Sequence, residues 1–227
     1  MLAFMMASCD DHAPVDLDIH IGYILCEDGR MLSEADFVKS GQEGVAVVFA
    51  EKTDDHPVLA VMLEEIPFVA FADTLSFDQK TSCDVAAFDG YENTVALQTS
   101  HLDRPALVDS TYLASAANYY VSPLGLLAFS SHYYFQSDFV PSVSEMGLLF
   151  LRRDEVNKVI ERLGGTPLST QNDGFSCWYW TSTEVEGNSL NQAWLVSMAD
   201  GSRHKAPKTN CYNARFIVEY NPLDVKH

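Results

Sequence analysis

The chain contains 227 residues, of which 47% are hydrophobic and 20% charged, with 12 glycines and 9 prolines. This composition is typical of a soluble globular protein and excludes the collagen-like, disordered and multi-pass membrane classes. The formal net charge is -18, and residues 1–110 hold 5 basic and 21 acidic residues, against 9 and 11 in the remainder. Such an acidic chain is a poor partner for the phosphate backbone of nucleic acid.

The first nine residues, MLAFMMASC, form an apolar run that ends in small residues and a cysteine, and two aspartates follow. This arrangement resembles the lipobox of bacterial lipoproteins, in which the cysteine is acylated after the signal sequence is cleaved. The resemblance implies a lipid anchor at Cys9 and a location at the outer membrane or cell surface. Residues 1–18 are therefore expected to comprise signal remnant, lipidated cysteine and linker; the alternative is an ordinary apolar N-terminus.

Strand-like patterns occupy residues 19–72. Asp28 and Gly29 stand between two short apolar runs, which is the usual signal of a tight hairpin. Two further apolar runs, GVAVVFAE (44–51) and HPVLAVMLEE (56–65), are kept to strand length by glycine, proline and polar residues around them. We therefore expect this region to form a sheet.

Two helices are expected in the middle of the chain. Residues 104–120 are rich in alanine and lack an internal glycine, and a helix can open there at the proline. A second helix is predicted from Ser142, because this serine and Glu145 form a capping-box pattern and an apolar stripe follows them. Gly164 and Gly165 are expected to end that helix.

The last third of the chain returns to strand-like segments. These are CWYWTSTEV (177–185), QAWLVSMA (192–199), RHKA (203–206) and ARFIVEY (214–220). Asp200 and Gly201 again predict a hairpin turn. The order strands, helix, helix, strands lacks the regular alternation of parallel α/β folds, so the sequence predicts the α+β class.

Five segments carry a family resemblance: GYENT (90–94), VPSVSEM (140–146), YWTSTE (179–184), AWLVSMADG (193–201) and NARFI (213–217). In this order they resemble the motifs of the bacterial C-type-lectin-like domain. The resemblance implies a C-type-lectin-like fold, a small twisted antiparallel sheet with two helices and long loops. It also implies a binding module related to adhesins, surface lipoproteins, pilus-associated proteins and retroelement-diversified receptors. We expect one such domain over residues 19–220 and a tail over residues 221–227.

Aromatic residues are densest in the late strands, at Trp178, Tyr179, Trp180 and Trp194. Because alternate residues of a strand face opposite sides, Trp178 and Trp180 are expected to share one face. Trp180 is interpreted as a core residue, whereas Trp178 can belong to the core or serve as a platform for a ligand. The polar residues 182–184 that follow can bind ligand hydroxyls or satisfy buried backbone groups, and the second role is favoured.

Two late loops make up the predicted recognition face. The loop at residues 186–192 is rich in amides, which both donate and accept hydrogen bonds, although such residues also simply form turns. A basic cluster at residues 203–208 can pair with an anionic ligand or with the acidic first half of the chain. The candidate ligand-binding residues are Trp178, Asn188, Asn191, Gln192, Trp194, Arg203, His204, Lys205, Asn210 and Tyr212.

Four cysteines remain once Cys9 is assigned to lipid: Cys26, Cys83, Cys177 and Cys211. Their spacings fit no zinc motif. An exported protein can pair four cysteines in three ways. Because Cys177 and Cys211 flank three strand-like segments, they are the first candidates for a disulfide, and four buried free thiols are the alternative.

Known enzyme motifs are absent from the sequence, including G-x-S-x-G, H-E-x-x-H, C-x-x-C, G-x-G-x-x-G and the P-loop. No EF-hand pattern occurs either. We therefore predict no catalysis, no metal and no cofactor. The predicted function is that of a surface lipoprotein that binds an extracellular protein or glycan through its late loops. The alternative is a structural or tip subunit of a pilus-like surface appendage, whose partners are other subunits.

Overall fold

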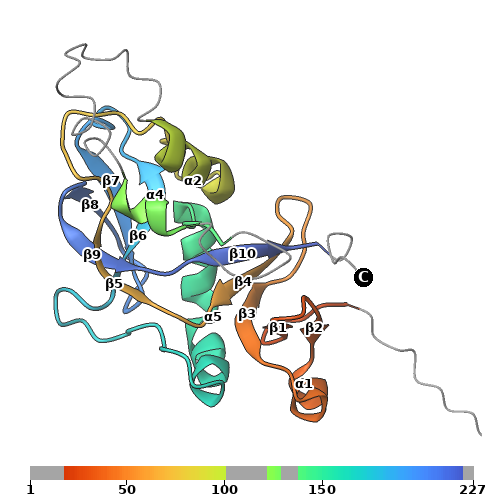
Figure 1. The fold of residues 1–227 in the computed structure, drawn as a ribbon. Coiled ribbons are helices and arrows are strands. Elements are labelled where there is room, and N and C mark those ends of the chain that lie inside the picture. The colour runs from red at the N-terminus through yellow and green to blue at the C-terminus, as the bar shows by residue number, and fades with distance from the viewer. Residues whose placement is uncertain (1–17, 101–121, 129–137, 222–227) are drawn as a thin grey trace, which may run out of the picture.

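The computed structural model describes residues 18–100, 122–128 and 138–221, so the predicted anchor at Cys9 and nearly all of the tail lie outside the described residues. Within these ranges the strands form two five-stranded sheets (Figure 1). The first sheet has the order β10-β4-β3-β1-β2, from β1 (Ile24–Cys26), β2 (Met31–Leu32), β3 (Gly44–Ala50), β4 (Val58–Met62) and β10 (Ile217–Tyr220). The second has the order β5-β9-β6-β7-β8, from β5 (Ile66–Ala70), β6 (Trp178–Glu184), β7 (Gln192–Ser197), β8 (Arg203–Pro207) and β9 (Cys211–Ala214).

The predicted α+β class is confirmed, but the sheet arrangement differs from the expected one. All strand pairs of the first sheet are antiparallel, whereas the second sheet contains one parallel contact, between β6 and β9. The resemblance implied one small twisted antiparallel sheet, and the structure has two sheets. The difference arises because the chain passes from one sheet to the other within a single apolar segment, at residues 214–220.

The described helices are α1 (Glu34–Ser40), α2 (Gly90–Thr99), α4 (Pro123–Leu127) and α5 (Val143–Arg162). α5 confirms the helix predicted from Ser142, which is its N-cap, and Gly164 follows its end with a φ of 78°. α1 and α2 are not predicted by the sequence patterns, because they lie in segments assigned to strands or to a motif alone. The helix expected at residues 104–120 lies outside the described residues. Among the described helices, none has the length and apolar character that a membrane span requires.

Both tight turns predicted from Asp-Gly pairs are confirmed. Between β1 and β2, the Gly29 N–H donates to the Cys26 carbonyl at 2.9 Å. Between β7 and β8, Gly201 has a φ of 75°, which glycine adopts without steric cost. A Cβ atom on Gly201 would also lie within 3 Å of the Phe150 ring of α5, so this turn and the helix approach closely.

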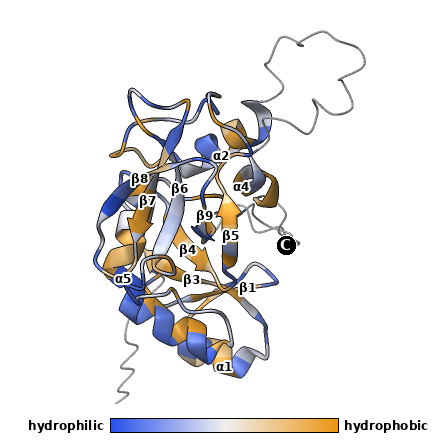
Figure 2. Ribbon diagram, turned by 90° about the vertical axis from the view of Figure 1, so that its left-hand side faces the viewer, coloured by the Kyte–Doolittle hydropathy of each residue, from blue (hydrophilic) through white to orange (hydrophobic). Residues whose placement is uncertain are grey.

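α5 packs against strands of both sheets, namely β3, β6 and β7. Its buried apolar side chains, including Met146, Leu149 and Val156, share a core with β3, β4 and β10 and with Tyr179 of β6. On the opposite faces of the strands a second core contains Trp180 and side chains of α2 and α4. In Figure 2, β3, β4 and β7 are coloured mostly as apolar, whereas α5 carries many polar residues along its length. The helix therefore joins the two sheets into one packed unit.

The last predicted strand, at residues 214–220, is divided between the two sheets. β9 ends at Ala214 in the second sheet and β10 begins at Ile217 in the first, so the chain changes sheets at Arg215 and Phe216. It makes the opposite change between β4 and β5. The two crossings are hydrogen-bonded to each other, since the Met62 N–H donates to the Phe216 carbonyl at 3.0 Å.

The buried guanidinium of Arg215 joins these crossings from inside. Its Nη1 donates to the carbonyls of Met62 at 3.1 Å and Leu63 at 2.7 Å, and its Nη2 donates to the carbonyl of Thr166. The carboxylate of Glu65 lies 3.8 Å from Nη2. A single cation thus binds three backbone carbonyls next to the crossings, and this pairing is the condition for burying such a group.

α2 and α5 begin against each other. The Ser142 hydroxyl caps α5, and the Glu145 carboxylate accepts the Ser142 N–H at 2.6 Å, which completes the predicted capping box. The same carboxylate accepts the Gly90 N–H of α2 at 3.4 Å. A Cβ atom on Gly90 would lie 2.8 Å from the Val140 carbonyl, so this contact requires glycine.

Two further residues of α2 extend this buried cluster. The Asn93 amide donates to the Ser182 hydroxyl at 3.3 Å, and the Thr94 hydroxyl accepts the Val140 N–H at 2.9 Å. Three of the motifs that carry the resemblance therefore meet here, those at residues 90–94, 140–146 and 179–184. The polar residues of these motifs hydrogen-bond to one another and hold the starts of α2 and α5 against β6.

Replacement of Arg215 by methionine should lower the free energy of unfolding by about 3 kcal/mol, because three carbonyls lose a charged donor while the apolar volume is kept; the Leu63 carbonyl retains the Thr166 N–H as a donor. Denaturant unfolding of the two proteins measures this difference. Arg152→Met is the matched control: Arg152 is exposed in α5 and pairs with Glu155 at 3.4 Å, so its loss should change stability by less than about 0.5 kcal/mol. Equal effects of the two substitutions would contradict the role of Arg215.

Burial raises the pKa of Glu145 to about 7, although the N–H groups of Ser142 and Gly90 act in the opposite direction. The folded protein therefore binds this proton more tightly than the unfolded chain, and the resulting stability, roughly 3 kcal/mol, is present below pH 4.5 and is lost as the pH rises to about 7. We expect Glu145→Gln to remove this part of the pH dependence in denaturant titrations. Glu155→Gln, on the exposed face of α5, should keep the native profile, and a native profile for Glu145→Gln would refute the assignment.

Candidate functional site

Apart from the half-buried Trp178, the side chains of β6 are buried, and several of them bind neighbouring segments. The Tyr179 hydroxyl donates to Glu65 at 2.5 Å, and the Trp180 Nε1 donates to the Val69 carbonyl at 2.9 Å. The Thr183 hydroxyl accepts the Val143 N–H at 3.2 Å, at the start of α5. The core assignment of Trp180 is confirmed, and Thr183 satisfies buried backbone, which is the role that the sequence favoured.

The predicted aromatic and basic residues lie on two opposite faces of the second sheet. The rings of Trp178 and His204 are 5.7 Å apart, on the face that carries Trp180. Lys205 lies opposite Trp194 on the neighbouring strand, with its Nζ 4.9 Å from the ring centroid. Because successive residues of a strand alternate, this second pair faces the other side of the sheet. The two pairs cannot bind one ligand on a common face.

The amide loop between β6 and β7 is occupied by its own hydrogen bonds. The Asn188 amide donates to the Gln192 side chain at 2.8 Å, and the Asn191 amide donates to Asn188 at 3.1 Å. The Asn191 side-chain oxygen also accepts the Ser76 N–H at 3.0 Å. These three predicted ligand-binding residues are brought together, but their amides already bind one another and a neighbouring loop.

Two more of the predicted residues lie at the β8–β9 turn and beyond it. Asn210 is exposed, and its N–H donates to the Pro207 carbonyl at 2.9 Å. Tyr212 packs against Trp180 with a ring distance of 5.4 Å and an edge-on geometry. Tyr212 is therefore mainly a packing residue, whereas Asn210 is open to solvent.

β8 presents the exposed cations at an edge of the second sheet. Arg203, His204 and Lys205 are exposed, and β8 is the last strand in the sheet order. The Ser197 N–H donates to the Ser202 carbonyl at 2.9 Å, so these two residues form a hydrogen-bonded pair between β7 and β8. In an antiparallel ladder such pairs alternate with pairs whose backbone groups point outward. The backbone groups of Arg203 and Lys205 therefore point away from β7, and no strand of the described residues pairs with them.

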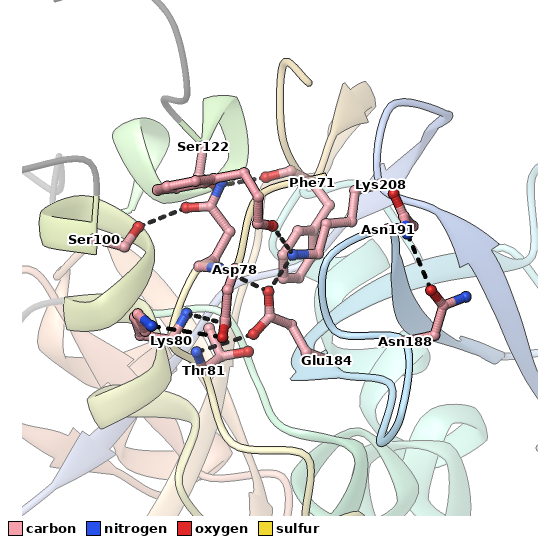
Figure 3. A network of polar contacts seen from close by, with 12 residues as sticks. Phe71, Asp78, Lys80, Thr81, Ser100, Ser122, Glu184, Asn188, Asn191 and Lys208 are labelled. Carbon is pink, nitrogen blue, oxygen red and sulfur yellow. Dashed lines mark hydrogen bonds and ion pairs between the residues drawn. The ribbon is translucent and has the colours of Figure 1, made fainter. Parts of the chain in front are cut away.

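Lys208, the fourth residue of the predicted basic cluster, does not belong to that surface. Its side chain is completely buried, with its Nζ against the Glu184 carboxylate and 3.0 Å from the Phe77 carbonyl that accepts its hydrogen bond (Figure 3). Burial lowers the pKa of Lys208 and raises that of Glu184, because both charged forms lose hydration. The sequence does not predict this pair, because no local motif around either residue indicates that a lysine is buried there.

The Lys208–Glu184 pair is the centre of a network that holds residues 71–82 against the second sheet. Glu184 accepts the Gln79 N–H at 2.9 Å and the Thr81 N–H at 3.2 Å. The Ser100 hydroxyl donates to the Gln79 side chain at 2.6 Å, so the end of α2 joins the same network (Figure 3). A segment with little secondary structure is thereby fixed by side chains.

The predicted disulfide between Cys177 and Cys211 is wrong, because all four cysteines of the described residues are free thiols. Cys177 is buried, with its sulfur 3.7 Å from the Ser197 hydroxyl, whereas Cys211 is exposed on β9. One thiol thus lies inside the sheet and the other at its surface. Cys26 is buried and Cys83 half-buried, so burial of all four thiols, the alternative, is not observed either.

Three surface hollows among the described residues lie away from the predicted recognition face. Hollows of about 320 and 450 Å³ border α1 and the end of α5, and one of about 270 Å³ borders β3 and the middle of α5. None of these three hollows is lined by a predicted ligand-binding residue. Within the described ranges, no group of three His, Cys, Asp or Glu side chains is placed to hold a metal ion.

No family model matches the chain, and no curated protein matches it. Among solved structures, the chain is similar to the crystal structure of a fimbrial protein from Bacteroides ovatus ATCC 8483, with a TM-score of 0.52 and 20% sequence identity. The similarity covers 88% of this chain and 49% of that one, so the chain spans about half the length of the fimbrial protein. At this identity the likeness concerns the fold, which the two proteins share over most of the present chain.

Proposed function

We propose that this chain is a non-catalytic subunit of a bacterial cell-surface appendage, in a structural or tip position. The observation that carries the proposal is the likeness of its fold to a fimbrial protein over 88% of the chain. The arrangement of the polar residues supports a non-catalytic role. Arg215, Glu145 and the Lys208–Glu184 pair are enclosed and bind backbone groups.

The open edge of β8 suits the assembly of such a subunit. Its outward backbone groups and exposed cations give a surface that another subunit can pair with, by hydrogen bonds and by charge. The chain as a whole carries a net charge of -18, so acidic surface is plentiful on any second copy. The lipid anchor expected at Cys9 would hold the appendage, or its base, at the outer membrane.

A second candidate function is the recognition of an extracellular protein or glycan, which the C-type-lectin-like motifs imply. The pairs Trp178–His204 and Lys205–Trp194 favour it, because each places a half-buried tryptophan ring beside an exposed polar side chain, which suits sugars and polar side chains. The meeting of three motifs in one buried cluster supports the C-type-lectin-like relationship, which we retain as part of this proposal. In this second candidate function, β8 is the surface that contacts the ligand.

The appendage assignment is tested by mechanical shearing of cells that produce the protein. We expect the protein to enter the filament fraction together with partner subunits, and to be detected there with an antibody. A lipoprotein unrelated to appendages should stay with the cells and serves as the control. Retention of this protein with the cells, with none in the filaments, would contradict the assignment.

The recognition function is tested by a variant that replaces Arg203, His204 and Lys205 with serine. In a screen against glycans and extracellular proteins, capture should fall by about tenfold or more if these residues form the contact, at an unchanged melting temperature. Serine at Arg152 and Lys158, which are exposed on α5, removes the same two formal charges and should leave capture unchanged. Equal capture by both variants would rule out β8 as the recognition surface.

A further inference from the structure

The buried lysine in the turn between β8 and β9 lies against a carboxyl group rather than at the surface. The side chains of Lys208 and Glu184 are both 0% exposed, and their charged ends are in direct contact. The Nζ of Lys208 also donates to the Phe77 carbonyl at 3.0 Å and lies 5.4 Å from the centroid of the Phe71 ring. The amine is thus held on one side by the carboxyl group and enclosed by the residues 71–77 segment.

The carboxyl group of Glu184 is held equally firmly. It lies at the end of β6, where the N–H groups of Gln79 and Thr81 donate to its two oxygens at 2.9 and 3.2 Å. A second acidic residue, Asp78, lies near enough to this carboxyl group for the two charges to interact.

An ion pair is an expensive arrangement in this enclosure. The free energy that two charges lose with their hydration is only partly recovered by their mutual attraction. Burial lowers the pKa of Lys208 and raises that of Glu184, which favours the neutral amine and the neutral carboxylic acid. These are the forms in which an amine is nucleophilic and a carboxyl carbon is electrophilic. Fixed contact supplies the proximity that the same reaction lacks in water.

We propose that Lys208 and Glu184 join covalently, forming an isopeptide amide between Nζ of the lysine and Cδ of the glutamic acid. A proton first passes from the Lys208 ammonium to the Glu184 carboxylate. The lone pair of Nζ then attacks Cδ and forms the C–N bond; the C–O bond to the leaving oxygen breaks, and this oxygen departs as water with one proton from the carboxylic acid and one from Nζ. The step is a condensation, so it needs neither an oxidant nor a reductant.

The surroundings of the pair fit the product as well as the reactants. The amide keeps one hydrogen on Nζ, and the Phe77 carbonyl is already placed to accept it. The remaining carbonyl oxygen can accept one of the two N–H groups, of Gln79 or Thr81, that now bind the carboxylate. The neutral amide removes both buried charges while it retains a donor partner and an acceptor partner.

The bond would close a covalent loop around the β7–β8 hairpin. Glu184 ends β6 and Lys208 follows β8, so residues 184–208 include both strands of the hairpin and the open edge of the second sheet. Tension applied along the chain would then pass directly from residue 184 to residue 208 through the bond, so the hairpin would not be extended. This inference goes beyond the proposed function and does not depend on it, because a cross-link of this kind stabilises the domain whatever it binds.

Mass spectrometry of the full-length denatured protein tests the bond. We expect the mass to be lower by one water molecule than the mass calculated for the same chain with its N-terminal processing included. Tryptic digestion should yield residues 163–203 joined to residues 206–215, with no cleavage after Lys208, because these two segments contain no other internal lysine or arginine. Lys80→Arg, a change of an exposed lysine that pairs with Asp78, should leave this cross-linked peptide intact.

Two variants separate this bond from other dehydrations, such as succinimide formation at Asp-Gly sequences. Lys208→Arg should restore the full mass, and Glu184→Gln should lose ammonia in place of water if the amide still forms. A native protein with the full sequence mass, or a loss of water that persists in Lys208→Arg, would overturn the proposal. If either variant fails to fold, fragmentation of the native cross-linked peptide decides the question directly.

Discussion

The hydrogen bonds of the Arg215 guanidinium are the interaction on which the arrangement of the two sheets depends. The chain leaves the first sheet after β4, returns to it before β10, and at each crossing the regular pairing of strands is interrupted. Arg215 binds the carbonyls of Met62, Leu63 and Thr166, which lie next to these crossings. Unpaired carbonyls inside a protein cost free energy, so the crossings are tolerated because one side chain pairs with all three. The cores on both faces can then form around a fixed junction.

Buried carboxyl groups solve the same problem elsewhere in the molecule. Glu145 binds N–H groups at the starts of α2 and α5, and Glu184 binds N–H groups of the loop at residues 71–82. Each carboxyl group thereby accepts hydrogen bonds from backbone N–H groups that have no partner in a strand or helix. This explains why an acidic protein buries some of its acidic residues at the junctions between elements while the remainder stay in solvent. It also explains why residues that resemble binding motifs serve the packing of the fold.

The surface left for function is accordingly narrower than the motifs imply. Asn188, Asn191 and Tyr212 are engaged within the protein, whereas the cations of β8 are exposed at a sheet edge. A sheet edge offers regularly spaced backbone groups, which suit the pairing of one protein with another better than the enclosure of a small ligand. This geometry agrees with the subunit function more closely than with a ligand pocket.

The sequence by itself determined the features that depend on near neighbours. Ser142 and Glu145 specify the start of α5 because the capping box spans three residues, and Asp28-Gly29 and Asp200-Gly201 specify turns because glycine alone tolerates the required backbone angles. Strand-like apolar segments that do not alternate regularly with helices were sufficient to predict the α+β class. Only the tertiary structure decided that residues 214–220 divide between two sheets, that Trp178 and Trp194 face opposite sides, and that Lys208 is buried. The burial of Lys208 depends on Glu184 and on residues 71–81, which lie far away in the sequence, and local patterns carry no information about such distant partners.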